Sequence, residues 1–85
     1  MPYNAELVDE LNLLNHFNLG TTQEGIKVHQ SAGPKMVDAA KRLFDKDLIS
    51  QEDGGYLTDL GHDAAEHSQN LILILTTPVQ VDTTS

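Results

Sequence analysis

The chain has 85 residues, a net charge of −8 and no cysteine. This length fits one small domain, and the lack of cysteine excludes disulfides and thiolate metal sites. Its apolar fraction of 39% is sufficient for a folded core. We expect such a domain to gain stability by dimerising, because it buries only about two thirds of its unfolded surface.

Neither end of the chain predicts a membrane or secretion signal. The first ten residues are acidic and lack the basic start and apolar run of a signal peptide. The longest apolar run, residues 71–75, is far shorter than the roughly 20 residues that span a bilayer. These features predict a cytoplasmic protein with no membrane contact.

Charge is distributed unevenly along the sequence. All five basic residues lie within residues 27–46, a segment with two acidic residues and a net charge of +3. Residues 1–26 carry −4 and residues 47–85 carry −7. The total charge argues against general affinity for nucleic acid, whereas the basic middle segment leaves such binding open.

A first helix is predicted after Asn4, which can cap it, and it ends near Gly20. One apolar stripe at helical spacing consists of Leu7, Val8, Leu11 and Leu14. Leu13 and Phe17 lie well round from this stripe, so the helix is apolar on two sides. Ordinary core packing and a partner interface are both open for the second side.

A short second helix is predicted over about residues 22–30, because Thr21 and Glu24 fit a capping box. A tight turn follows, and a third helix spans about residues 34–46, with Pro34 at its first position. Its apolar face comprises Met36, Val37, Ala40, Leu43 and Phe44. Lys35, Arg42 and Lys46 share an opposite ridge. This ridge either faces a phosphate backbone or is a solvated face whose charges pair locally, for example Asp38 with Arg42.

Two short strands, residues 48–51 and 56–58, flank the turn at residues 52–55 and predict a β-hairpin. Thr58 then caps a last helix over about residues 59–75. Gly61 inside this helix indicates close packing against another element. Residues 1–75 therefore form a single domain, and residues 76–85 are predicted to be a flexible tail.

The last helix predicts a homodimer. A coiled-coil-like seam runs through Leu60, Ala64, His67, Leu71 and Ile74. Residues 71–75 are apolar all round, as a helix or alternatively a strand, and a small monomer does not easily cover them. The predicted interface comprises Leu13, Phe17, His67, Leu71, Ile72, Ile74 and Leu75.

The sequence of elements resembles the winged helix-turn-helix of MarR-like bacterial regulators. Residues 43–49 resemble that family's end of the recognition helix leading into "KGLI", and residues 56–61 resemble its "LT-x-x-G" after the wing. The resemblance covers residues 21–67. It implies a mainly α fold with a small β-hairpin, dimerising through the C-terminal helix. The chain also resembles a small bacterial protein family without an established role.

The resemblance implies a transcriptional regulator that binds double-stranded DNA. The third helix would enter the major groove and present Lys35, Asp38, Lys41, Arg42 and Lys46, with Lys27 and Ser31 near the phosphates. Two positions depart from the family pattern. Glu52 and Asp53 make the wing tip acidic, and Asp47 stands where the family often has glycine, in a conformation that aspartate tolerates.

Other chemistry is not predicted. His62 and His67 are five residues apart, about 140° round a helix, and do not converge on one metal ion. No nucleophile motif, phosphate-binding glycine loop or paired carboxylates occur, so we expect neither an enzyme nor a cofactor. The acidic wing and the apolar C-terminal run support an alternative function, a winged-helix module that binds an unidentified protein partner and no DNA.

Overall fold

The structure is a computed structural model that describes residues 2–20 and 24–78. In these ranges it has three α-helices, α1 (Ala5–Leu14), α2 (Pro34–Asp45) and α3 (Asp59–Thr76), and one 3-10 turn, η1 (Gln30–Ala32). The strands are β1 (Ile26–Lys27), β2 (Ile49–Gln51) and β3 (Gly54–Leu57), and they form one antiparallel sheet in the order β1-β3-β2. The expected mainly helical fold with a small β-structure is confirmed.

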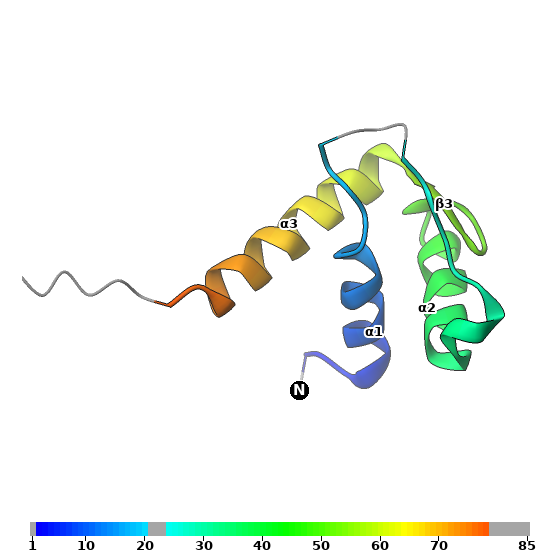
Figure 1. The fold of residues 1–85 in the computed structure, drawn as a ribbon, viewed down its shortest axis with the longest axis horizontal. Helices are drawn as coiled ribbons and strands as arrows, with labels where there is room; N and C mark the ends of the chain where they lie inside the picture. The colour runs from blue at the N-terminus through cyan, green and yellow to red at the C-terminus, as the bar shows by residue number, and fades with distance from the viewer. Residues whose placement is uncertain (1, 21–23, 79–85) are drawn as a thin grey trace, which may run out of the picture.

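Helix α1 lies between the other two helices (Figure 1). The Asn4 side chain accepts a hydrogen bond from the Leu7 N–H at 2.8 Å, so the predicted cap is confirmed. The helix ends at Leu14, earlier than the predicted end near Gly20. Tighter turns follow, in which the N–H groups of His16 and Phe17 bond the carbonyls of Leu13 and Leu14.

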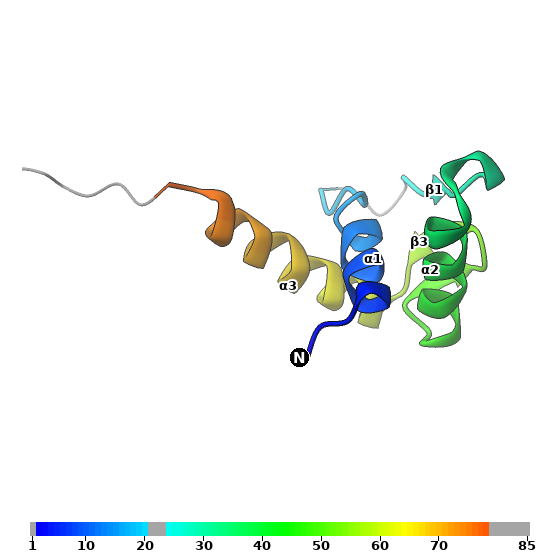
Figure 2. The same ribbon diagram turned by 90° about the horizontal axis from the view of Figure 1, so that it is seen from below.

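The prediction of a helix over residues 22–30 is wrong for residues 24–30, which are the described part of this segment. Ile26 and Lys27 form strand β1, which pairs with Gly55 and Gly54 of β3. A Cβ on Gly54 would lie 2.3 Å from the Ile26 carbonyl oxygen, so this pairing requires a glycine. Thr21, half of the proposed capping box, lies outside the described residues. Between residues 24 and 33, helical structure is limited to η1, seen beside β1 in Figure 2.

Helix α2 ends where the sequence predicts. Asp47 has a φ of 64°, the left-handed conformation usual for a residue just past a helix end. Its N–H bonds the Phe44 carbonyl, and the Leu48 N–H bonds the Leu43 carbonyl, each at 3.0 Å. This Schellman-type end turns the chain into β2, and Glu52 and Asp53 then connect β2 to β3.

Helix α3 is fixed to the hairpin at its first turn. Thr58 caps it, because its Oγ1 accepts from the Gly61 N–H at 3.0 Å and donates to the Asp47 carbonyl at 2.7 Å. A Cβ on Gly61 would lie 1.7 Å from the Leu48 carbonyl oxygen, which confirms the predicted close packing. The helix continues to Thr76, so residues 71–75 are helical and not a strand.

The core lies between α1, α2 and the start of α3. Its fully buried apolar residues are Leu13, Leu14, Phe17, Ala39, Ala40, Leu43, Ile49 and Ala65. The second half of α3 extends away from this core (Figure 1). No helix within the described residues is long and apolar enough to cross a membrane.

Candidate functional site

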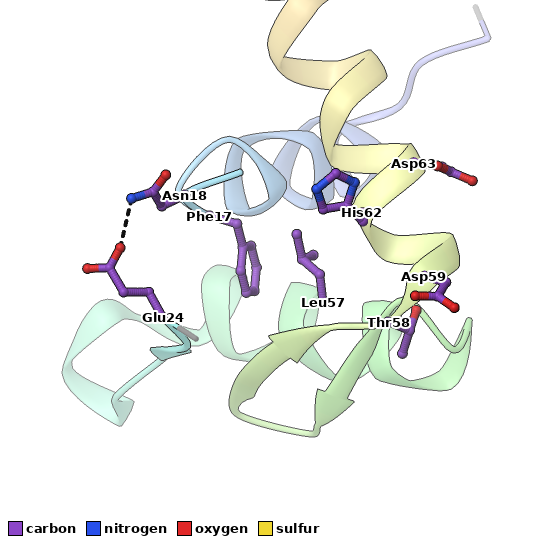
Figure 3. A pocket seen from close by; sticks show the side chains of 8 residues that line it. All are labelled: Phe17, Asn18, Glu24, Leu57, Thr58, Asp59, His62 and Asp63. Atoms are coloured by element: carbon purple, nitrogen blue, oxygen red, sulfur yellow. Dashed lines mark hydrogen bonds between the residues drawn. The ribbon is translucent and has the colours of Figure 1, made fainter. Parts of the chain in front are cut away.

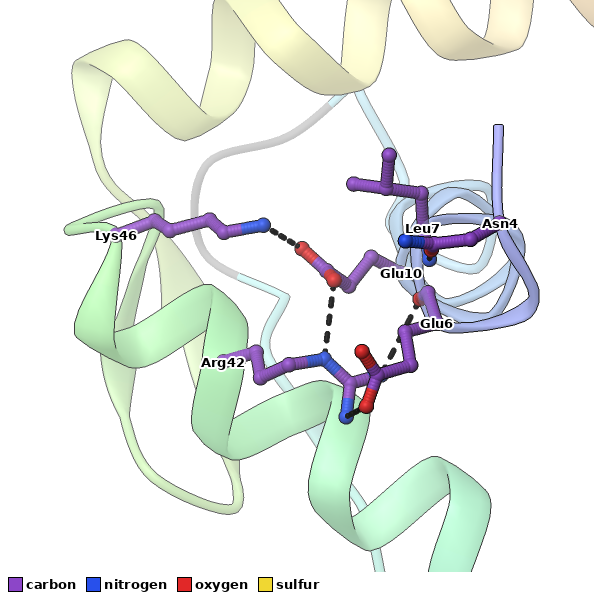
Figure 4. Close-up of polar contacts among 6 residues, drawn as sticks. All are labelled: Asn4, Glu6, Leu7, Glu10, Arg42 and Lys46. Carbon is purple, nitrogen blue, oxygen red and sulfur yellow. Dashed lines mark hydrogen bonds and ion pairs between the residues drawn. The ribbon is translucent and has the colours of Figure 1, made fainter. Parts of the chain in front are cut away.

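A charged cluster joins α1 to α2 (Figure 4). The Glu10 side chain is only 5% exposed, and its carboxylate accepts from Arg42 Nε at 3.0 Å and from Lys46 Nζ. Arg42 also donates to the Glu6 carbonyl at 3.2 Å and lies 3.7 Å from the Glu6 carboxylate. The two cations are thus neutralised within the chain, by acidic side chains from α1.

This cluster corrects the predicted cationic ridge. Arg42 and Lys46 point toward α1, and Arg42 pairs with Glu10 and Glu6 instead of the neighbouring Asp38. At about 100° per residue, the face of α2 opposite its buried side carries Lys41, Asp38 and Asp45. That outward face has one cation and two anions, which is unfavourable beside phosphate groups.

The remaining predicted DNA-binding residues do not form one surface, because they come from β1, η1 and different sides of α2. Lys35 and Ser31 are exposed at the start of α2 and in η1. Lys27 lies 3.8 Å from Asp53 at the hairpin tip. An open cleft of about 640 Å³ lies between α2 and the hairpin tip, and it is lined by charges of both signs, including Lys27, Lys41, Glu52 and Asp53.

The predicted dimer residues fall into two groups. Leu13 and Phe17 are each 3% exposed and belong to the core, so they are not available to a partner. His67 is exposed on α3. Exposed fractions from 43% to 70% are found for Leu71, Ile72, Leu73, Ile74 and Leu75, which together form the apolar end of α3.

An apolar groove continues this surface toward α1. It has a volume of about 250 Å³ and is lined chiefly by Tyr3, Val8, Leu11, Leu71, Ile72 and Leu75. We call it the α1–α3 groove. The sequence predicts an apolar stripe that includes Val8 and Leu11, but it does not show that these two residues line a groove while Leu14 of the same stripe is buried in the core. Which side is buried is decided by the position of α2.

Side chains of α3 fix the groove in place. Gln69 Nε2 donates to the Phe17 carbonyl at 2.7 Å and the Leu14 carbonyl at 3.2 Å. Ser68 Oγ donates to Asn15 Oδ1 at 2.7 Å. These bonds tie two residues of α3 to the end of α1 and the turns that follow it, so they hold α3 at a defined position beside α1.

A separate cavity of about 370 Å³ lies between the segment that follows α1, the end of β3 and the start of α3 (Figure 3). Phe17 and Leu57 face each other across it, and Asn18 donates to Glu24 at 2.7 Å on its rim. His62, Asp59 and Asp63 stand on the α3 side. Among the residues that the structure describes, no three such side chains lie close enough together to hold a metal ion, here or elsewhere.

Comparison with known proteins gives a family without an assigned role. The model of the Family of unknown function (DUF5669) matches residues 1–76. Neither the curated proteins nor the solved structures gave a match to this chain. The family match spans all of the helices and strands described above, and the chain belongs to this family of unknown function.

Proposed function

We propose that this protein is an interaction module that self-associates through the apolar end of α3 and the α1–α3 groove, and that it does not bind DNA. The observation that carries the proposal is the apolar end itself. Five consecutive helical residues with apolar side chains are 43% to 70% exposed, and the described part of the chain covers none of them fully. An apolar surface of this kind, continuous with a groove, is typical of a protein interface.

The charge pattern favours a second copy as the occupant. Residues 70–78 contain no charged side chain, although the chain as a whole carries −8. This segment therefore brings no acidic group of its own into a contact with a second copy, so it adds no repulsion between like charges there. Because burial of apolar area drives the contact, salt that screens the overall repulsion should favour association.

The framework we propose is a winged helix with a reduced second helix. The order α1, η1, α2, hairpin and α3 agrees with the resemblance seen in the sequence, and β1 adds a third strand. Its recognition helix would be α2. Pairing of Arg42 and Lys46 with Glu10, together with an outward face bearing Asp38 and Asp45, supports a role other than DNA recognition.

DNA binding is the second candidate, because Lys35 and Lys41 are exposed on α2. Fluorescence anisotropy with mixed-sequence duplex DNA at low salt tests it. Our proposal expects no binding. Binding that is lost on replacing Lys27, Lys35 and Lys41 with glutamate would favour this second candidate over the first.

Size exclusion with light scattering tests the proposed self-association. We expect the wild-type chain to have about twice its 9.3 kDa mass. The double variant Ile74→Gln, Leu75→Gln should be monomeric. It replaces two apolar side chains of the proposed interface with polar ones, and neither side chain is part of the core. Leu73→Gln is the control, since Leu73 is 61% exposed but lies on the side of α3 away from the α1–α3 groove. A wild-type monomer would contradict the proposal.

A further inference from the structure

The seam of α3 is nearly symmetric about His67, and its members are exposed except for Ala64, which packs partly against the core. Leu60 and Ile74 lie seven residues before and after it, and Ala64 and Leu71 lie three and four residues away. At about 100° per residue these five residues fall within a sector of about 80° on one side of the helix. A helix face with this symmetry matches itself when a second copy runs in the opposite direction.

Leu60 is the exposed apolar residue at the start of this seam. It is 57% exposed in the first turn of α3, whereas the α3 residues that line the α1–α3 groove lie between Ser68 and Leu75. In an antiparallel pair, it would stand opposite Ile74 of the second copy. That position is beside the second copy's groove, where Val8, Leu71 and Leu75 offer an apolar lining for a leucine side chain.

We propose that two copies pair with their α3 helices antiparallel, around a two-fold axis beside His67, and that Leu60 of each copy enters the α1–α3 groove of the other. This arrangement rests on the self-association proposed above. It covers the apolar end of each α3 with the first half of the other α3. It also gives the groove one defined occupant, a side chain of the same sequence.

Charge favours the antiparallel direction over the parallel one. The acidic residues of α3 (Asp59, Asp63 and Glu66) all lie in its first half, and its second half is uncharged. Parallel pairing would place the two acidic halves side by side, with no cation on α3 to separate them. Antiparallel pairing places each acidic half beside an uncharged half, and it aligns the two helix dipoles favourably.

Disulfide trapping tests the arrangement directly, because the chain has no cysteine of its own. His67→Cys should give a disulfide-linked pair under mild oxidation, since two residues on the axis of packed helices come within bonding distance. A mixture of Leu60→Cys and Ile74→Cys chains should give the mixed disulfide as the main product. Leu73→Cys, on the other side of α3, is the control and should remain largely unlinked.

The alternative outcomes separate the arrangement from the association. Rapid linkage of Leu60→Cys chains to one another would indicate parallel helices and overturn the arrangement. Light scattering of the same variants under reducing conditions reports association alone. A paired mass without the expected links overturns only the arrangement, and a monomeric mass overturns the proposed function as well.

Discussion

Glu10→Gln tests the charged cluster that joins α1 to α2. The substitution keeps the shape of a side chain that is 5% exposed, but it removes the charge shared by Arg42 and Lys46. A lost hydrogen bond to a charged group costs about 1.5–3 kcal/mol. Arg42 and Lys46 remain 26% and 47% exposed and regain hydration, so we expect a total loss of about 2 kcal/mol from the free energy of unfolding.

That loss is a large part of the stability of so small a domain, which is about 4–13 kcal/mol for this length. Urea denaturation followed by circular dichroism measures it. With a slope of about 1 kcal/mol per molar urea, the midpoint should fall by about 2 M. All variants are compared at one protein concentration, because self-association adds stability that depends on concentration.

Glu6→Gln is the matched control. The Glu6 side chain is 70% exposed and 3.7 Å from Arg42, so its removal should cost less than about 0.5 kcal/mol. A Glu10→Gln midpoint equal to that of Glu6→Gln would refute the reasoning. It would mean that the Glu10 contacts do not hold α1 against α2, and that Arg42 and Lys46 are available for other partners.

Substitutions at three further positions test the ends of the helices. Gly61→Ala should destabilise the fold by about 3 kcal/mol in urea denaturation, because its Cβ would meet the Leu48 carbonyl; a wild-type midpoint would contradict this contact. Thr58→Ala should cost about 1 kcal/mol by the same measurement, whereas Thr58→Ser keeps the cap and should cost less; equal losses would argue against the capping bond. Asp47→Gly should raise the thermal midpoint, because glycine adopts a φ of 64° without strain, and a lowered midpoint would show that the Asp47 side chain stabilises the turn.

Local signals predicted the starts of α1 and α3 and the end of α2, but not the end of α1. Asn4, Thr58 and Asp47 each act through groups within a few residues along the chain, so their roles can be read from the sequence. Strand β1 could not be predicted in this way. Its two residues are a strand only because they pair with Gly54 and Gly55, almost 30 residues later. The predicted second helix failed because this distant pairing outweighs the local capping signal.

The candidate site was predicted only in part. The exposure of residues 71–75 can be predicted from their composition. These residues are apolar on every side of the helix, and a helix packed along one face leaves its other sides exposed. The ion pairs of Arg42 and Lys46 depend on Glu10, 32 and 36 residues earlier, and helical spacing alone suggested the nearer aspartates instead. The groove was missed because two helices, far apart in sequence, form its walls.

Sedimentation equilibrium over a range of salt tests the central claim most directly. If the apolar end of α3 joins two acidic chains, association should hold or tighten as NaCl rises from about 0.05 M to about 0.5 M, because screening reduces their repulsion. The wild-type chain should then show about twice its mass of 9.3 kDa at every salt concentration. A 9.3 kDa species throughout, or association that weakens with salt, would contradict the account.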